Sequence, residues 1–209
     1  MPRTGRPRSF DDHQIAEGAM ELFWSRGFAA TSLRDLKEGL GVLPGSLYAA
    51  YGDKHGLFLR ALGHYVGAAQ EQATEIATGA TILPGIRALL LEVLQAARTT
   101  PGRGCMLGNI AAELLPGDEA AGRLVHSAFS SLEAGLEQGL RAAQRSGEVR
   151  PGIDCGAQAR LLLALMQGLH IVARAEADPQ RLADAVDAAL APLTDPADPS
   201  SSPESRRTR

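Results

Sequence analysis

The chain has 209 residues and a formal net charge of −3; hydrophobic residues make up 44% of it but aromatic residues only 4%. This composition allows a substantial core, and the charge does not by itself indicate a nucleic-acid-binding protein. The apolar residues are mostly Ala and Leu, which favour helices, and alternating runs of β-branched and aromatic residues are absent. We therefore predict an all-α protein.

Two cysteines, Cys105 and Cys155, are too few and too far apart for a disulfide framework or a zinc knuckle. The five histidines show no metal-ligand spacing, and no glycine-rich phosphate loop follows a strand. We expect no metal, no cofactor and no enzyme activity. Neither an apolar stretch behind the N-terminal arginines nor an apolar run of about 18 residues is present, so we expect a cytoplasmic protein without a membrane segment.

The N-terminal residues 1–9 contain three arginines and no acid, and predict a flexible basic arm. A first helix begins at Asp11 or Asp12 and ends at Gly27, which we expect to form a left-handed cap. A second short helix follows Ser32, because Ser32 and Asp35 have the spacing of a capping box.

A third short helix is predicted from Pro44 to Tyr51, since a proline in the first turn costs no intrahelical hydrogen bond. Asp53 caps a long fourth helix that fades near Gly79. The tail from residue 194 has nothing apolar to bury and predicts disorder. Five further helical patterns, separated by Gly and Pro, cover 82–99, 104–115, 119–146, 155–176 and 179–191.

Two short helices joined at a glycine are typical of a helix-turn-helix, although many helical proteins contain such corners. The stretch from Arg8 to Leu59 closely resembles the DNA-binding domain of the TetR family of regulators. The matching residues are Phe23, Gly27, Phe28, Thr31, Ser32, Asp35, Leu36, Gly41, Val42, Gly45, Ser46, Leu47, Tyr48, Tyr51 and Lys54. The resemblance implies an N-terminal three-helix helix-turn-helix domain and a C-terminal helical domain for ligand binding and dimerisation. The expected segments are a flexible arm at 1–9, the DNA-binding domain at 10–55, the regulatory domain at 56–193 and a disordered tail at 194–209.

The resemblance further implies a homodimer on double-stranded, palindromic operator DNA. Tyr48 offers a hydroxyl to a phosphate, and Lys54 lies at a helix N-terminus, where an ammonium group and backbone N–H groups together attract phosphate. The first turn of the third helix has few groups for bidentate base contacts, so specificity would depend on Arg34, the arm and DNA shape. The residues expected at the DNA are Arg6, Arg8, Thr31, Ser32, Arg34, Leu43, Pro44, Gly45, Ser46, Tyr48 and Lys54.

For the C-terminal domain, the resemblance implies dimerisation through the last long helices, with 119–146 and 155–176 as candidates. Small residues in the first of these would let two helices approach closely, but they would serve equally well in an intramolecular core. They are Gly122, Ala128, Ala134, Gly135 and Gly139.

Cys105 is a candidate sensor because it opens a helix beside Arg103, an environment that lowers a thiol pKa. In some TetR-type regulators that sense electrophiles or oxidants, a cysteine at this position is the sensor. The alternative is that Cys105 is a small buried hydrophobic residue. A conventional pocket for a small apolar or amphipathic effector is equally compatible with the sequence, with Asn109, Phe129, Met166 and His170 as candidate lining, each of which could instead be core.

We therefore predict a transcriptional regulator, most simply a repressor that a small molecule, an electrophile or an oxidant releases from its operator. The competing hypotheses are a helical ligand-binding protein and a thiol enzyme, both without DNA binding. Neither accounts for Tyr48, Lys54 and the basic arm.

Overall fold

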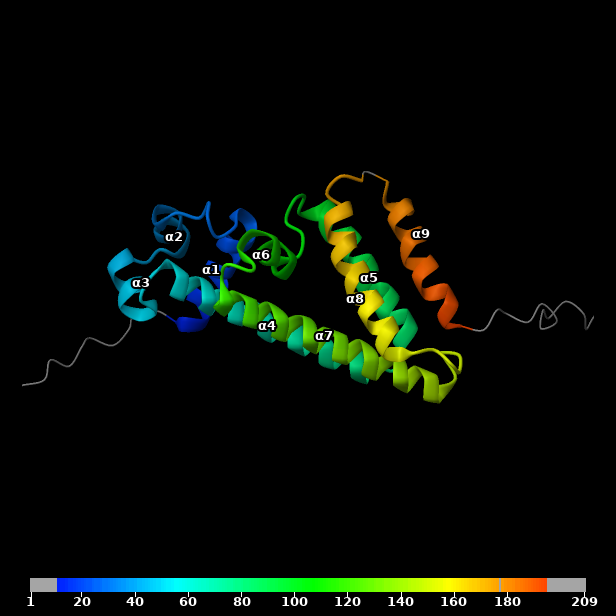
Figure 1. Cartoon of the computed structure of the whole chain (residues 1–209). Coiled ribbons are helices and arrows are strands. Elements are labelled where there is room, and N and C mark those ends of the chain that lie inside the picture. The colour runs from blue at the N-terminus through cyan, green and yellow to red at the C-terminus, as the bar shows by residue number, and fades with distance from the viewer. Residues whose placement is uncertain (1–10, 177, 195–209) are drawn as a thin grey trace, which may run out of the picture.

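The computed structural model describes residues 11–176 and 178–194, and this part of the chain is helical without a strand, which confirms the predicted all-α class (Figure 1). The predicted arm, with Arg6 and Arg8, and the tail from residue 195 lie outside the described residues. The helices are α1 (Asp12–Arg26), α2 (Leu33–Leu40), α3 (Pro44–Tyr51), α4 (Lys54–Thr78), α5 (Ile82–Thr99), α6 (Met106–Leu114), α7 (Glu119–Ser146), α8 (Cys155–Val172), α9 (Pro179–Leu190) and a 3-10 turn η1 (Ala191–Leu193).

Local sequence signals set the ends of the N-terminal helices. The capping box of α2 is present, since the Asp35 amide donates to the Ser32 hydroxyl and the Ser32 amide donates to the Asp35 carboxylate. The hydrogen bonds from Ser32, and then the contact with Arg26, lower the pKa of Asp35 to about 2. Gly27 ends α1 at a positive φ of 84°, but its ψ of 166° is not that of the left-handed cap that the sequence predicted.

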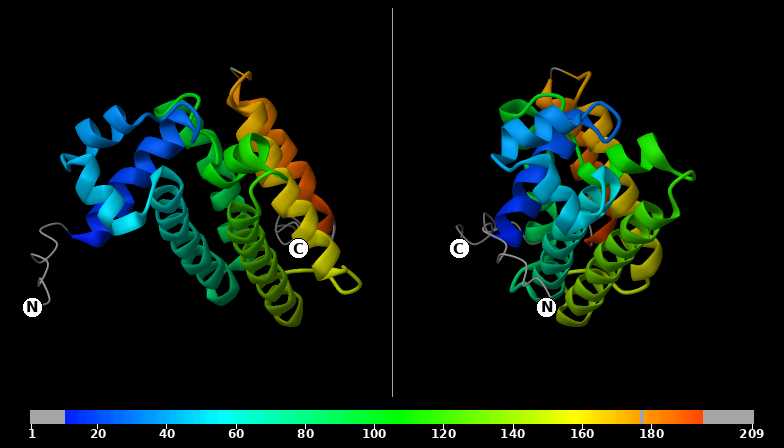
Figure 2. Two further views of the ribbon diagram at one scale, coloured as in Figure 1. Left: turned by 60° about the vertical axis from the view of Figure 1, so that its left-hand side comes forward. Right: turned by 90° about the vertical axis from the view of Figure 1, so that its left-hand side faces the viewer.

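Helices α4 and α7 lie side by side as a long pair that joins the two halves of the molecule (Figures 1 and 2). The pair is parallel, because Asp118 contacts His55 at one end and Gly139 contacts Ile76 near the other. A Cβ on Gly135 would overlap the carbonyl oxygen of Ala73. The small residues of α7 therefore bring two helices of the same chain together.

The described residues form two apolar cores. One lies among α5, α7, α8 and α9, around Leu90 and Leu162. The other joins α1–α3 to α6 and the first halves of α4 and α7, around Phe58 and Met106. Helices α1–α3 thus share their core with α6, and side chains pack continuously across the position where the sequence suggested a domain boundary.

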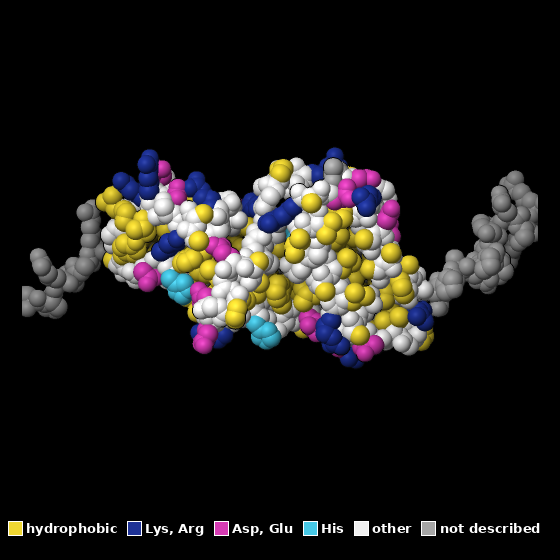
Figure 3. All heavy atoms as spheres, turned by 45° about the horizontal axis from the view of Figure 1, so that its top comes forward, with side chains coloured by type: hydrophobic (Ala, Val, Ile, Leu, Met, Phe, Trp, Pro, Cys, Tyr) yellow, Lys and Arg dark blue, Asp and Glu magenta, His cyan; other side chains and the backbone are white. Residues whose placement is uncertain are grey.

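Helix α8 leaves a row of small and apolar side chains uncovered. Ile171 is 69% and Leu161 is 52% exposed, and a Cβ on Gly168 would meet nothing within 4 Å. Figure 3 shows apolar side chains gathered over the C-terminal half. Among the described residues, α8 is also the one helix whose length and hydropathy would allow it to cross a membrane. Core helices of globular proteins meet the same two criteria.

Candidate DNA-binding and effector sites

The first turn of α3 is open to solvent. Leu43 is the N-cap residue and is 67% exposed, Pro44 opens the helix, and Gly45 and Ser46 are exposed. A Cβ on Gly45 would meet nothing within 4 Å. This turn presents one apolar side chain, one hydroxyl and bare backbone, a surface that another molecule can approach closely.

Tyr48 and Lys54 flank this turn. Tyr48 is half-buried on α3, and Lys54 is the first residue of α4. The Lys54 ammonium lies 4.5 Å from the ring centroid of Phe28, a cation–π contact that restrains the side chain. The Asp53 carboxylate accepts from the Gly56 amide, so it uses one of the free N–H groups at this helix end.

Three further residues predicted at DNA differ in their accessibility. Arg34 is exposed and pairs with Glu38 one turn along α2, at 2.8 Å. Ser32 is exposed, although its hydroxyl caps α2. Thr31 is 0% exposed, and its hydroxyl donates to the Gly27 carbonyl at 2.6 Å. Its burial corrects the expectation for Thr31, because a buried, already bonded hydroxyl cannot also reach a phosphate.

Cys105 is the N-cap residue of α6 and is buried. Its Sγ lies 4.0 Å from the hydroxyl of Tyr65 on α4. Burial, and then the neighbouring thiol, raise the pKa of Tyr65 above its ordinary value, so the phenol stays protonated at neutral pH. Arg103, which the sequence suggested would activate the thiol, instead directs its guanidinium to α1.

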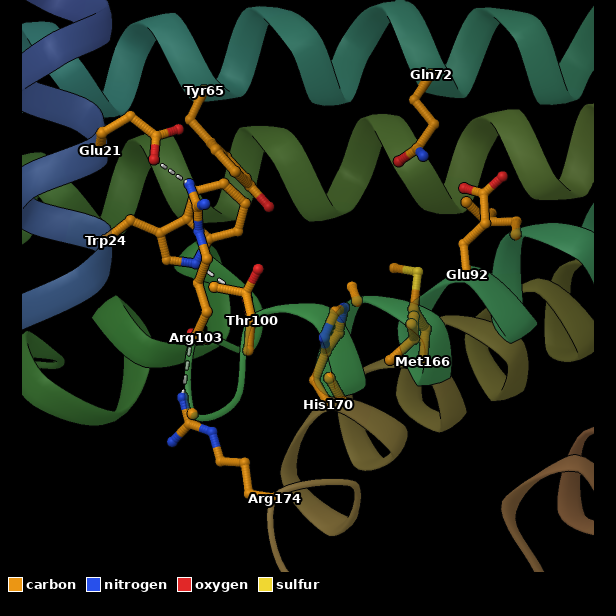
Figure 4. A pocket seen from close by; sticks show the side chains of 16 residues that line it. Glu21, Trp24, Tyr65, Gln72, Glu92, Thr100, Arg103, Met166, His170 and Arg174 are labelled. Carbon is orange, nitrogen blue, oxygen red and sulfur yellow. Dashed lines mark hydrogen bonds and ion pairs between the residues drawn. The ribbon is translucent and has the colours of Figure 1, made fainter. Parts of the chain in front are cut away.

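The guanidinium of Arg103 bonds to the Glu21 carboxylate at 2.5 Å and lies 3.7 Å from the Trp24 ring centroid (Figure 4). The Trp24 indole N–H donates to the Gly104 carbonyl at 2.9 Å. The loop before α6 is therefore fastened to α1 by one ion pair, one cation–π contact and one hydrogen bond.

The same loop is fastened through Asn109 to the turn that follows α8. The Asn109 side-chain amide donates to the Arg103 carbonyl at 2.8 Å, and Arg174 donates to the Asn109 side-chain oxygen at 2.7 Å. Asn109 thus links the loop to Arg174 through its side chain. Phe129 packs against the N-terminal core.

At its other end, α6 holds the turn between α1 and α2. The two carboxylate oxygens of Glu113 accept from the backbone amides of Phe28, at 3.0 Å, and Ala29, at 2.7 Å. Glu113 was not predicted from the sequence, because no local pattern shows that a residue on α6 contacts a turn more than 80 positions earlier.

A groove of about 520 Å³ opens between α1, α4, α5 and α8 (Figure 4). Of the predicted effector residues, Met166 and His170 line it, whereas Cys105 is not part of the lining and lies 4.0 Å from the hydroxyl of Tyr65, which is. Burial, and then the charge of Arg174, lower the pKa of His170, which favours a neutral imidazole at pH 7. The lining residues are Glu21, Trp24, Tyr65, Gln72, Leu89, Glu92, Val93, Ala96, Ala97, Thr100, Gly102, Arg103, Gly104, Met166, His170 and Arg174.

The chain is similar to known DNA-binding regulators over most of its length. Residues 15–61 match the family model "Bacterial regulatory proteins, tetR family", and residues 83–189 match "Tetracyclin repressor-like, C-terminal domain". The chain is 32% identical to the uncharacterized HTH-type transcriptional regulator YezE of Bacillus subtilis, over 90% of this chain and 99% of that protein. It is 31% identical to the HTH-type transcriptional repressor ComR of Escherichia coli, over 85% of this chain and 86% of that protein.

A solved structure of a cysteine mutant of the regulator CifR, complexed with a 26-base-pair double-strand operator DNA, superposes with a TM-score of 0.74 at 30% identity. The match covers 90% of this chain and 100% of that one. Together with the two family models, which cover the helix-turn-helix and the C-terminal helices separately, this likeness confirms the resemblance seen in the sequence. The chain belongs to the TetR family of transcriptional regulators.

Proposed function

We propose that the chain is a homodimeric repressor that binds operator DNA and releases it when an effector acts on α6. The observation that carries this proposal is the position of α6. Its first turn follows the loop that walls the groove, and its last turn holds the α1–α2 turn through Glu113. A change at the groove therefore reaches the DNA-binding unit through one short helix.

DNA binding is assigned to the exposed first turn of α3, with Tyr48 and Lys54 as phosphate contacts and Arg34 beside them. The operator complex of CifR and the description of ComR as a repressor support this assignment. The arginines of the arm, Arg6 and Arg8, keep their predicted role at the DNA. A cytoplasmic location follows from the proposed operator DNA.

The DNA contacts are tested by fluorescence anisotropy with labelled double-stranded DNA that this protein has selected from a random library. Lys54→Ala should weaken binding to all selected sequences by a similar factor and lower the salt slope by about 1, because one phosphate contact is lost. Arg145→Ala, at the far end of α7, serves as the control. Absent or salt-independent binding would contradict the assignment.

We propose that the dimer interface is formed by the uncovered face of α8. Gly135 and Gly139 of α7 are not available for it, because they pack against α4 within the chain. The positions of this face, all exposed except the half-buried Gly168, recur at the four-and-three spacing with which helices pair. They are Ala157, Leu161, Ala164, Gly168 and Ile171. Gly168→Arg should give a monomer in analytical ultracentrifugation, whereas Gly67→Arg, at another uncrowded helical glycine, should remain a dimer. A dimeric Gly168→Arg would overturn this seam.

The groove has the size of typical small-molecule sites, so a bound effector is the first candidate signal. A thiol-reactive compound is the second, since the Cys105 thiol lies 4.0 Å from the hydroxyl of Tyr65, which lines the groove. A quinone would accept the thiolate at a ring carbon and take up a proton on oxygen, which leaves a thioether at the start of α6.

Benzoquinone added to the protein–DNA complex distinguishes the two signals. If the thiol is the sensor, Cys105→Ser should abolish release from DNA. Cys155→Ser should release like the unmodified chain, because Cys155 is equally buried but lies at the start of α8, at the opposite end of the body. Release that persists in Cys105→Ser would leave groove binding as the signal.

A further inference from the structure

At one wall of the groove, the guanidinium of Arg103 lies against an aromatic ring and a carboxylate. The Arg103 guanidinium lies 3.7 Å from the centroid of the Trp24 ring, and its Nη2 donates to a carboxylate oxygen of Glu21 at 2.5 Å. The Tyr65 ring stands edge-on to Trp24, at 5.0 Å between centroids. An aromatic face beside a carboxylate is the arrangement that binds guanidinium and ammonium groups.

The hold on Arg103 is incomplete. Its Nε is buried and has no hydrogen-bond partner among the described residues, so the loss of its hydrogen bond to water is uncompensated there and costs free energy. The Arg103–Glu21 contact is also partly exposed, with a quarter of the arginine side chain and half of the glutamate side chain accessible. Exposed ion pairs contribute little net stability, so an entering cation can compete with the guanidinium.

The rest of the groove favours an amphipathic cation. Leu89, Val93 and Met166 supply apolar walls. Glu92 faces the same space from α5 and has no ion-pair partner among the described residues (Figure 4). Of the basic groups at the groove, Arg174 is held by Asn109 and the Arg103 carbonyl, and the lowered pKa of His170 favours its neutral form.

We infer that the effector of this groove is an organic cation with a planar, delocalised head group and an apolar tail, which displaces Arg103 from Trp24 and Glu21. The inference rests on the proposed function, because displacement of the Arg103 guanidinium would release α1 from the loop that precedes α6.

Trp24 is the only tryptophan in the chain, so its fluorescence reports directly on this site. The full-length protein, without DNA, is titrated with para-butylbenzamidinium, with the neutral para-butylbenzamide and with the anionic para-butylbenzoate. The amidinium should give a saturable change in Trp24 emission. The amide and the benzoate should bind at least about tenfold more weakly, because they lack the charge that the aromatic face and the carboxylate recognise.

Three variants test the competition. Glu21→Gln should weaken amidinium binding about tenfold and leave the amide unchanged, since only the cation uses the carboxylate. Glu17→Gln, one turn earlier on α1, is the matched control and should bind as the unmodified chain does. Arg103→Ala should bind the amidinium more tightly, because the internal competitor is gone; a thermal unfolding curve establishes that this variant is folded.

Equal binding of all three probes, unchanged amidinium affinity in Glu21→Gln, or weaker amidinium binding in folded Arg103→Ala would each overturn the inference. Because the titration needs no DNA, it is separate from the proposed function. Amidinium binding that fails to release operator DNA would count against the regulatory role of the groove and leave the cation site standing.

Discussion

The α4–α7 pair is held differently at its two ends. Near the DNA-binding unit, the His55–Asp118 contact joins the two helices through partly exposed side chains. Toward the far end, glycines of α7 lie directly on the backbone of α4, at Ala73 and Ile76. Exposed polar contacts can exchange with water at little cost, whereas close-packed backbones cannot shift without creating voids or overlaps. We propose that the far end stays fixed, and that the DNA-binding end, together with the α6 residues in its shared core, is the part that an effector moves.

The largest effect is expected at the far end. Gly135→Ala should lower the free energy of unfolding by about 2–3 kcal/mol, because the added methyl group overlaps the Ala73 carbonyl and the helices must separate. Gly67→Ala, where nothing lies within 4 Å, should instead stabilise the chain by about 0.5–1 kcal/mol through helix propensity. Urea denaturation measures both. Equal effects in the two variants would show that the helices are not closely packed at Gly135.

A smaller loss of stability is expected at the DNA-binding end. Glu113→Ala removes the acceptor of two exposed backbone amides, at Phe28 and Ala29, which water can then satisfy, so the cost should be about 1 kcal/mol. Operator binding should suffer more than stability, because the α1–α2 turn loses its tie to α6. Fluorescence anisotropy with the selected DNA measures this loss. Glu113→Gln, which keeps one acceptor oxygen, should bind DNA with an affinity between those of the unmodified chain and Glu113→Ala. Unchanged DNA binding in folded Glu113→Ala would break the proposed link through α6.

The smallest effect concerns pH. The Ala121 amide, and after it the His55 ring, hold the pKa of Asp118 below its ordinary value. A lowered folded-state pKa means that the carboxylate contributes stability above the unfolded-state pKa, near 3.8, and loses it as pH falls through the folded-state pKa.

Unfolding of Asp118→Asn should therefore depend less on pH below about 4 than unfolding of the unmodified chain, by under about 1 kcal/mol. Glu71→Gln, an exposed change on α4, should leave the profile as it is. A profile of Asp118→Asn identical to that of the unmodified chain would show that the contact at this end is not a charged one.

Much of the fold was predictable because its signals are local. The capping box at Ser32, the proline that opens α3 and the glycines that follow the helices act within a few residues, so α2, α3 and α4 lie where the sequence predicts them. The expectation for Thr31 failed because its burial depends on the packing of α1, which a hydroxyl in a helix-start pattern does not reveal.

The effector site was less predictable, for a related reason. The sequence singled out Cys105 and Arg103 as neighbours along the chain, but the structure turns Arg103 toward Glu21 and Trp24, about 80 positions earlier. Of the residues predicted to contact an effector, Met166 and His170 line the groove, whereas Asn109 bonds to the loop before α6 and Phe129 packs against the N-terminal core.

The sequence by itself determined the all-α class, the helix-turn-helix and the TetR family, because capping residues, helix breakers and a dense run of matching positions are written in contiguous stretches. Only the tertiary structure decided that the loop before α6 is fastened to α1, that Glu113 holds the α1–α2 turn, and that α8 rather than α7 leaves an uncovered face. These features depend on how helices far apart in the chain are oriented against one another, and that orientation follows from the packing of whole surfaces rather than from any local pattern.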